Sequence, residues 1–404
     1  MEININSEIG QLEGVIVHTP DIELERATPE TIHEALFVDL LNLPIARREH
    51  LLFKSVLSKV AETFEVSDLL EEILQDEIVK QQIVSTVCKN ENVDFLKEAL
   101  LPLSPKDLAA ALIGGFEMPA HENSFPLKPL YNMFFTRDAS SSIGNNVLIN
   151  QMTFPVRHRE SLIMSAIFRH KKDFHAAHTL HLPDSNATIE GGDVLVARED
   201  VLLVGTGVRT NKQAIDQLIA LAKQNIVPQN IVIQELPKSP DSFIHLDMVF
   251  TFLDKGYGMA YLPLAAKESS YKTTHISVQA DTVSYTEKPT LLKALQDLHF
   301  DLKLISCGNP DSLPTQQREQ WHSGANFFAL APGKVLGYAR NKHTLDQLNK
   351  HGFEIIDAED IVSNNKNIHD YAACAVVVDC HELPRGGGGA RCMTMPIKRK
   401  NVGW

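Results

Sequence analysis

Hydrophobic residues at helical spacing dominate the first part of the chain. Residues 46–64 form a predicted helix whose apolar side chains share one face: Leu51, Leu52, Val56, Leu57 and Val60. The helical pattern continues through residues 67–103, and Ser104 followed by Pro105 is a typical helix start. The segment is rich in Leu, Glu and Lys and has few strand-forming runs. We therefore predict an all-helical insert at residues 46–120.

Short runs of β-branched residues alternate with helical segments in the rest of the chain. The predicted strands are residues 14–18, 146–149, 193–196, 201–204, 231–233, 248–250, 327–329 and 375–378. The predicted helices are residues 160–168, 211–224, 289–298 and 341–351, with a further helix start at Thr28-Pro29. Units of strand, strand and helix therefore repeat. This rhythm predicts an α/β domain made of residues 1–45 and 121–404, which the helical insert interrupts.

The composition excludes several classes of partner. Of the 404 residues, 44% are hydrophobic and 22% are charged, as in ordinary globular proteins. The net charge of −13 argues against a nucleic-acid partner, because phosphates bind clustered Lys and Arg. No stretch approaches the ~20 apolar residues that cross a bilayer, and the N-terminal segment does not resemble a signal peptide. We therefore expect a cytoplasmic protein with neither a nucleic-acid nor a membrane partner.

The cysteines indicate reduced thiols rather than disulfides or a metal site. There are five, and no two form a Cys-x-x-Cys pair: Cys88, Cys307, Cys374, Cys380 and Cys392. The run Cys380-His381-Glu382 contains residue types that bind zinc, but a second pair of ligands is not evident in the sequence. The prediction is that the protein uses no metal and no cofactor.

One of these cysteines follows an unusual glycine run. The segment RGGGGARCMTMP, residues 385–396, places four glycines just before Cys392. An ordered glycine run permits a close backbone approach, whereas a linker has the same composition. A nucleophilic thiolate usually needs a positive neighbour, here Arg391 or a cationic substrate. Because an isolated cysteine is more often a small buried residue, this segment alone leaves both interpretations open.

Two further segments carry potential acid–base groups. In the run FIHLDMVFT, an extended backbone would place His245 and Asp247 on the same side. Histidine transfers protons near neutral pH, although a structural pair at a strand end is an equal alternative. In the run IEGGDVL, two glycines would let the backbone bend closely against a ligand and present Glu190. A simple polar turn is the alternative there.

A fourth segment, YNMFFTRD at residues 131–138, combines an aromatic pair with polar groups. The two phenylalanines indicate a pocket wall, and Asn132, Arg137 and Asp138 surround them. The alternative is that Arg137 and Asp138 form a structural ion pair.

The combination of these groups favours a guanidinium substrate. The carboxylates of Asp138 and Asp247 can bind a guanidinium through paired, planar hydrogen bonds. Its positive charge would stabilise a thiolate beside it. Cys392 could then attack the central carbon, while His245 and Glu190 move protons as a nitrogen leaves.

Four motifs, NMFFTRD, IEGGD, HLDMVFT and GGGGARCMTMP, occur in the order that is typical of one family. On these motifs the chain resembles bacterial arginine deiminases of the guanidino-group-modifying superfamily. The resemblance covers the whole chain and implies a five-bladed, pseudo-symmetric α/β propeller with the site on its central axis. It also implies hydrolysis of L-arginine to L-citrulline and ammonium, and a homo-oligomer with a dimer favoured.

The resemblance further implies roles for individual residues. Cys392 would form an alkylthiouronium intermediate. His245 and Glu190 would transfer protons, and Asp138 and Asp247 would hold the guanidinium.

The positions that match the family's binding site for the α-carboxylate are Asn132, Arg157 and Arg209. Many family members carry an arginine in the glycine loop where Gly387 stands, so weaker binding and changed specificity are both open. The glycines are expected to form a mobile gate over Cys392.

Two alternatives stay open. An amidinotransferase, a dimethylarginine hydrolase or an agmatine deiminase would use the same groups on the same fold. Arg157 and Arg209 favour a free amino acid, because agmatine has no carboxylate. A catalytically silent propeller used for binding is a different class of protein, although every motif acid, His and Cys is present.

Overall fold

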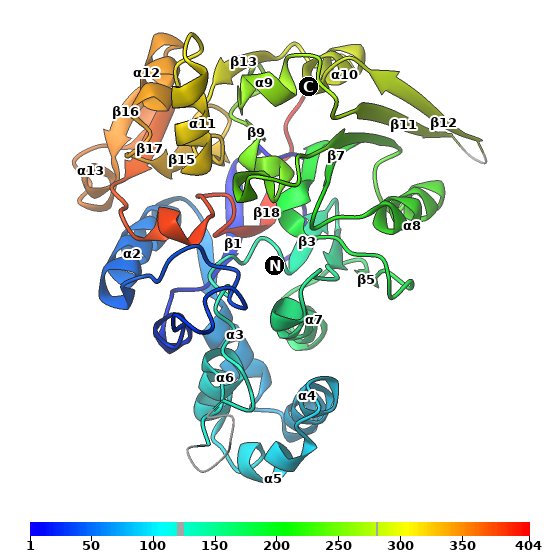
Figure 1. Ribbon diagram of the computed structural model, residues 1–404, viewed down its shortest axis with the longest axis vertical. Coiled ribbons are helices and arrows are strands. Elements are labelled where there is room, and N and C mark those ends of the chain that lie inside the picture. Colours follow the sequence, from blue (N-terminus) through cyan, green and yellow to red (C-terminus); the bar gives the residue numbers. More distant parts are fainter. Residues whose placement is uncertain (119–124, 280–281) are drawn as a thin grey trace.

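The computed structural model describes residues 1–118, 125–279 and 282–404 as a mixed α/β protein (Figure 1). Within these residues the strands form five sheets. In sheet order they are β18 (Met395–Arg399), β1 (Leu12–Val17) and β2 (Glu62–Glu65); β3 (Ser140–Ile143), β4 (Asn146–Ile149) and β5 (Thr179–His181); β6 (Val194–Arg198), β7 (Val201–Thr206), β8 (Asn230–Glu235), β11 (Thr273–Gln279) and β12 (Thr282–Lys288); β9 (Phe250–Phe252), β10 (Tyr257–Ala260) and β13 (Lys303–Ser306); β14 (Phe328–Ala331), β15 (Lys334–Tyr338), β17 (Cys374–Val378) and β16 (Glu354–Asp357). The predicted boundary between residues 120 and 121 lies outside the described residues.

All five sheets contain the same pattern of strand pairing. In β3-β4-β5 and β6-β7-β8, the first strand is antiparallel to the second, and the second is parallel to the third. The pattern recurs in β9-β10-β13, β14-β15-β17 and β18-β1-β2. A parallel pair needs a crossover connection, usually through a helix. In each sheet the chain passes through at least one helix between the two parallel strands.

The helices are α1 (Ile22–Glu25), α2 (Leu43–Val60), α3 (Val66–Ile73), α4 (Glu77–Asn90), α5 (Lys97–Leu100), α6 (Pro105–Gly114), α7 (His158–His170), α8 (Lys212–Lys223), α9 (Leu262–Ala265), α10 (Leu291–Asp297), α11 (Leu313–Trp321), α12 (Lys342–Lys350) and α13 (Ala358–Val362). The four helices predicted after residue 121 are confirmed as α7, α8, α10 and α12. Ser104 begins α6 as predicted, because its side chain accepts a hydrogen bond from the backbone nitrogen of Asp107.

One sheet joins the two ends of the chain. β18 is antiparallel to β1, with Leu12 opposite Arg399 and Ile16 opposite Met395. The buried Arg399 guanidinium donates to the carbonyl oxygen of Gly10 at 2.7 Å. The segment that ends in β18 is therefore fixed against the N-terminal strand.

The predicted helical insert contains one strand that the sequence pattern did not indicate. β2 is parallel to β1, so it belongs to the sheet that joins the chain ends. Helix α2 is part of the connection between these two strands. The open edge of β1 supplies backbone partners to a segment of only four residues, and such pairing depends on tertiary context more than on propensity. Helices α3 to α6 lie together at one end of the molecule, at the bottom of Figure 1.

The apolar face of α2 differs in part from the predicted one. Val56 and Leu57 are buried as expected, but Leu51 is 46% exposed and Phe53 is buried instead. The buried side of α2 also includes two polar residues, Glu49 and His50. Hydrophobic spacing alone could not place these polar side chains in the interior.

Two other local predictions were wrong. No helix begins at Thr28, because residues 28–36 form turns after the short helix α1. The strand predicted at residues 248–250 begins only at Phe250, because Leu246–Met248 forms a 3-10 turn. The carboxylate of Asp193 stabilises this turn by accepting a hydrogen bond from the Leu246 backbone nitrogen at 2.9 Å.

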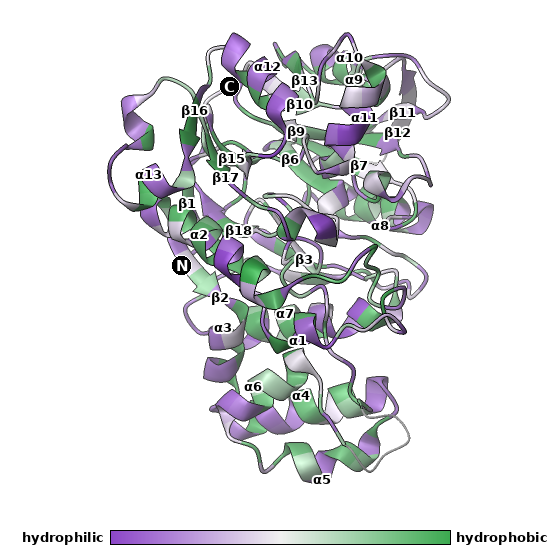
Figure 2. Cartoon of the chain, turned by 60° about the vertical axis from the view of Figure 1, so that its left-hand side comes forward, coloured by the Kyte–Doolittle hydropathy of each residue, from purple (hydrophilic) through white to green (hydrophobic). Residues whose placement is uncertain are grey.

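The interior consists mainly of aliphatic strands covered by amphipathic helices. All five residues of β17 are buried, as is typical of a parallel strand inside a sheet. Figure 2 shows hydrophobic and hydrophilic stretches alternating along α4 and α6. Among the described residues, no helix combines the length and apolarity that a bilayer crossing requires.

Candidate active site

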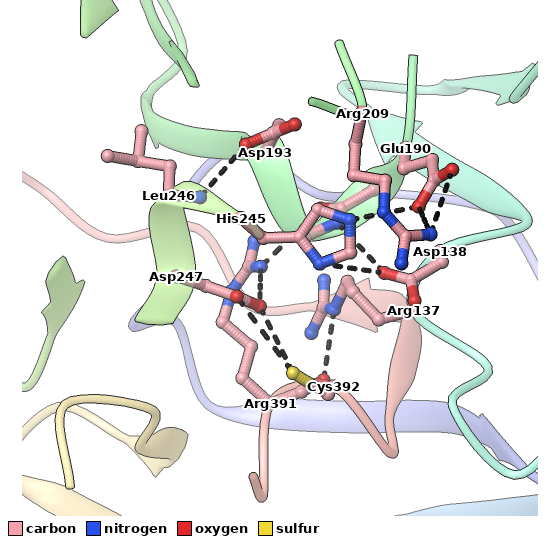
Figure 3. A network of polar contacts seen from close by, with 12 residues as sticks. Arg137, Asp138, Glu190, Asp193, Arg209, His245, Leu246, Asp247, Arg391 and Cys392 are labelled. Carbon is pink, nitrogen blue, oxygen red and sulfur yellow. Dashed lines mark hydrogen bonds and ion pairs between the residues drawn. The ribbon is translucent and has the colours of Figure 1, made fainter. Parts of the chain in front are cut away.

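The predicted catalytic residues come together because each precedes the first strand of one repeated unit. Asp138 lies just before β3 and Glu190 just before β6. His245 and Asp247 lie before β9, and Cys392 lies before β18. Figure 3 shows these five side chains pointing toward one another from four different segments. The repeated pairing pattern thus brings residues from distant parts of the chain into one site.

Cys392 is buried against a carboxylate. Its side chain is 3% exposed, and its Sγ lies 3.8 Å from Asp247 Oδ2 and 3.9 Å from Asp247 Oδ1. Burial, followed by the negative charges of Asp247 and Asp138, raises the pKa of the Cys392 thiol well above its ordinary value. The group is therefore a neutral thiol in this state, and a cation placed beside it would favour the thiolate.

His245 links two other carboxylates. Its Nε2 lies 3.0 Å from Glu190 Oε2, and its Nδ1 lies 3.7 Å from Asp138 Oδ1. A Cβ on Gly192 would lie 2.5 Å from the imidazole, so the glycine makes room for His245. The expectation that this glycine permits approach of a ligand was therefore only half right, because the group that approaches is a protein side chain.

The route by which His245 and Asp247 reach the site differs from the predicted one. They do not alternate along an extended strand, because His245 precedes the 3-10 turn Leu246–Met248 and Asp247 lies within it. Nevertheless both are buried in the same site, His245 beside Glu190 and Asp247 beside Cys392.

Two arginines neutralise the carboxylates around His245. Arg157 Nη1 lies 2.8 Å from Asp138 Oδ2, and Arg209 Nη1 lies 3.0 Å from Glu190 Oε2. Although burial raises the pKa of Glu190, Arg209 and His245 outweigh it and hold that pKa well below its ordinary range. Glu190 is therefore ionised near neutral pH without a bound substrate.

Arg391 belongs to a second buried network, which includes the carboxylate of Asp247 that lies beside Cys392. Its guanidinium donates to Glu8 at 2.9 and 3.1 Å and to Asp247 Oδ2 at 2.9 Å. Although burial raises the pKa of Glu8, Arg391 outweighs it and lowers that pKa to about 2. Arg391 thus fixes the carboxylate that faces Cys392, and most of its charge is compensated by Glu8 and Asp247.

Sequence reasoning missed one residue that positions the nucleophile. Asn326 Oδ1 accepts hydrogen bonds from the backbone nitrogens of Arg391 at 2.9 Å and Cys392 at 3.2 Å. Its Nδ2 donates to the Asp247 carbonyl oxygen at 3.1 Å. Asn326 lies directly before the segment that leads into β14, as the catalytic candidates do before their strands. The strand-strand-helix rhythm was the signal that could have identified it.

Asp138, Glu190 and His245 bring three potential metal ligands within 4.8 Å of one another. Guanidinium groups already compensate both carboxylates, and a metal needs a neutral imidazole. Burial lowers the pKa of His245, but Asp138 and Glu190 outweigh it and raise the value to about 9. The arrangement favours a protonated histidine over a metal ligand, and the expected lack of a metal stays a prediction.

A comparison with known proteins identifies the family. The arginine deiminase family model matches residues 115–399. The chain belongs to the arginine deiminase family. It is 32% identical to an arginine deiminase of Bacillus thuringiensis subsp. konkukian, with 99% of each chain covered. It is also 32% identical to an arginine deiminase of Limosilactobacillus reuteri, with 99% of this chain and 98% of that one covered.

Two solved structures have a fold similar to that of this chain. A dimethylarginine dimethylaminohydrolase adduct with S-methyl-L-thiocitrulline has a TM-score of 0.52 at 12% identity, over 96% of this chain and 100% of that one. An amidinotransferase from Microseira wollei has a TM-score of 0.52 at 15% identity, over 99% and 98%. At these identities the likeness describes the fold alone.

The three residues expected to bind a carboxylate differ in their access to a cavity. Arg209 lines a cavity of about 780 Å³, where its guanidinium lies over the ring of Phe154 at 4.8 Å. Arg157 is 3% exposed and also contacts Glu160, while Asn132 Nδ2 donates to the Ala35 carbonyl oxygen at 2.7 Å. Of the three, Arg209 is therefore the one that reaches the cavity.

The glycine loop separates this cavity from Cys392. Gly386 and Gly387 line the cavity, whereas Gly388 and Gly389 pack against the interior of the protein. The Tyr338 hydroxyl donates to the Gly388 carbonyl oxygen at 3.1 Å. Because Cys392 is almost completely buried, substrate access requires some segment around it to move, and the glycine loop as that segment stays a prediction.

Replacing Gly388 or Gly389 by alanine is expected to reduce kcat/KM by about tenfold or more. A Cβ on Gly388 would overlap the ring of Phe135, and a Cβ on Gly389 would lie 2.7 Å from Asn326, which positions the nucleophile. Steady-state kinetics and a thermal melt measure the effect. The matched control is Gly256→Ala, because the nearest atom to its Cβ is 4.0 Å away. Unchanged kinetics in both loop variants would contradict a gating role.

The charge of His245 should also appear in the pH dependence of stability. Its folded-state pKa of about 9 lies above the ordinary 6.5. Its stabilising contribution is therefore complete below pH 6.5 and is lost as the pH rises to about 9. Urea unfolding between these values should show a falling free energy of unfolding, and His245→Gln should reduce that slope. The exposed His381→Gln is the control and should leave it unchanged.

Proposed function

We propose that this chain hydrolyses L-arginine to L-citrulline and ammonium. The observation that carries the proposal is a buried thiol placed 3.8 Å from the Asp247 carboxylate and opposed by a second carboxylate, Asp138. Two carboxylates around a thiol suppress the thiolate until a cation binds between them. A guanidinium is a planar cation that both carboxylates can bind through paired hydrogen bonds. The substrate itself would therefore generate the nucleophile.

The chemistry would proceed in two steps. As the guanidinium binds, the Cys392 thiol loses its proton to solvent. The thiolate attacks the guanidinium carbon to form a C–S bond, and the C–N bond then breaks as His245 donates a proton to the nitrogen that leaves as ammonia. The neutral His245 then takes a proton from a water whose oxygen attacks the same carbon, and the C–S bond breaks to release citrulline. Glu190, hydrogen-bonded to His245 Nε2, would orient the imidazole and stabilise its protonated form.

The other end of the substrate would lie toward the cavity. Arg209, together with Arg157 and Asn132, is proposed to bind the α-carboxylate. Arg157 and Arg209 contact Asp138 and Glu190 in the present structure. Binding would therefore bring one further positive group, the guanidinium, and one further negative group, the carboxylate, into the site together. A substrate with both groups is therefore favoured over agmatine, which lacks the carboxylate.

The five sheets support the proposal that the α/β part is a five-bladed propeller. Each blade would correspond to one antiparallel-then-parallel set of strands, and the sheet of β18, β1 and β2 would close the ring. Residues 1–45 and 121–404 would form this propeller and residues 46–120 an insert, with β2 contributing to the closing blade. A homo-oligomer, with a dimer favoured, is also proposed, and light scattering of the purified protein would test it.

The deciding experiment is an assay of citrulline and ammonia from purified protein with arginine, in the presence of a metal chelator. Equal amounts of both products from arginine, and none from agmatine, would support the proposal. Dimethylarginine, and arginine with glycine, serve as parallel substrates for the sister activities. Product from one of these alone would replace the proposed reaction, and no product from any substrate would favour a silent binding protein.

A further inference from the structure

A second cavity, of about 480 Å³, lies between α4, α7 and the end of β4. We call it the α4–α7 cavity. It shares no lining residue with the cavity that Arg209 reaches. In Figure 1, α7 lies between the sheets and α4, so the cavity is where the helical part meets the α/β part. Its volume is within the range of about 300–1,000 Å³ that is typical of small-molecule sites.

Two buried side chains that line the α4–α7 cavity have unused hydrogen-bonding atoms. Asn150 is 1% exposed and Ser161 is 9% exposed. Neither Asn150 Oδ1 nor Ser161 Oγ has a hydrogen-bond partner. Buried polar atoms are rarely left unpaired, because their lost hydration is not replaced. Because both atoms have almost no accessible surface, a polar ligand in the cavity would supply the missing partners only by shifting the segment that carries them.

The charge of the cavity lining selects the ligand. Among the described residues that line it, Arg169 is the only Lys or Arg, and there is no carboxylate. Burial, and then the charge of Arg169, lower the pKa of His170 and His181, so both are neutral at pH 7. One positive charge matches one carboxylate, which Arg can bind in a bidentate manner. A phosphate with two negative charges would be only half neutralised by Arg169.

The rest of the lining suits a hydrocarbon body. Ile83, Met152 and Leu162 contribute apolar surface between the polar groups. We propose that the α4–α7 cavity is an effector site that binds a small organic monocarboxylate, with its carboxylate on Arg169 and its apolar body against these side chains.

The end of β4 connects this cavity to the catalytic carboxylates. Asn150 Nδ2 donates to the Asp138 carbonyl oxygen at 2.8 Å. The Gln151 carbonyl oxygen accepts from the backbone nitrogen of Ile189, next to Glu190, at 3.0 Å. Both Asn150 and Gln151 line the α4–α7 cavity. A ligand that shifts this segment would therefore shift the two carboxylates that hold His245.

Helix α7 provides a second connection. Its first turn carries Glu160, which holds Arg157 through a hydrogen bond of 2.7 Å. The following turns carry Ser161, Ser165 and Arg169 into the cavity lining. A ligand in the cavity should consequently change the turnover rate and should not compete with arginine for its site.

Calorimetric titration of the full-length protein with hexanoate tests the proposal, with hexylamine and inorganic phosphate as comparison ligands. We expect saturable one-to-one binding of hexanoate below about 10 mM and none of hexylamine. Arg169→Gln should weaken this binding about tenfold or more, because it removes a charged hydrogen-bond partner. Its turnover without hexanoate should equal that of the unchanged protein. In the kinetic assay, hexanoate should change kcat.

Two variants complete the test. Ser165→Trp should fill the cavity and abolish binding, with an unchanged thermal melt as evidence that the protein is folded. Arg48→Gln, an exposed arginine of α2, is the matched control and should bind normally. No binding of hexanoate, binding of phosphate alone, or equal binding in all three variants would overturn the proposal. A rise in KM alone would place hexanoate in the arginine site and would also overturn it.

Discussion

Replacing Cys392 by serine should reduce citrulline formation by about 10⁴-fold or more while leaving the fold intact. The serine hydroxyl is nearly the same size, so its packing beside Asp247 and Asn326 should persist. A hydroxyl is a far weaker nucleophile, because the guanidinium charge cannot lower its pKa enough to form an alkoxide. Arginine should still bind, since the carboxylates that hold its guanidinium are unchanged. Single-turnover assays and calorimetry would measure the two properties separately.

The control for this variant is another buried thiol. Cys88 lies in α4, is fully buried, and contacts none of the catalytic residues. Cys88→Ala should leave kcat unchanged. It should lower the free energy of unfolding by about 1 kcal/mol or somewhat more. Activity of the Cys392 variant within tenfold of the unchanged protein would remove the covalent intermediate from the proposed mechanism.

Replacing Arg391 by methionine should lower the free energy of unfolding by about 3–5 kcal/mol, the largest stability effect that we expect. Methionine fills a similar volume but leaves Glu8 and Asp247 as buried carboxylates without their cation. The pKa of Glu8 is about 2 in the folded state and 4.5 ordinarily. Its stabilising contribution is therefore present above pH 4.5 and is lost as the pH falls to about 2. Urea unfolding at pH 7 is the appropriate measurement.

A matched control separates this effect from the loss of any arginine. Arg47 forms an ion pair with Asp21 in which both side chains are more than one third exposed. Because solvent screens such a pair, Arg47→Met should change stability by less than about 1 kcal/mol. If Arg391→Met were equally mild, the network of Glu8, Arg391 and Asp247 would not stabilise the site.

The candidate catalytic residues could be predicted because each lies in a short motif with its own chemistry. Cys392 follows a glycine run, and His245 and Asp247 are two residues apart. Asn326 carries no such local signal, since its role depends on hydrogen bonds to backbone nitrogens far away in the sequence. Its partners become neighbours only when the sheets of β14 and β18 are both formed. The strand-strand-helix rhythm indicated its position before a strand, but its hydrogen-bonding role depends on tertiary structure and is not visible in the sequence.

The secondary structure shows the same division. Long periodic segments such as α7 and α8 could be predicted from hydrophobic spacing. The four-residue strand β2 could not, because only the edge of β1 makes its extended form favourable. The 3-10 turn after His245 was also missed. It depends on a hydrogen bond from the Leu246 backbone nitrogen to Asp193, a residue far away in the sequence that lies just before β6.

The pairing of β1 with β18 has a consequence for the order of events during synthesis. β1 leaves the ribosome long before its antiparallel partner β18, because β18 lies far later in the sequence. Until then, one side of β1 has no partner, and a domain with such long-range pairing folds slowly. Cys392 lies just before β18, so the same late segment supplies both the nucleophile and the strand that completes this sheet. A chain that stops before residue 392 therefore has neither, and the catalytic site cannot assemble before β18 has been synthesised.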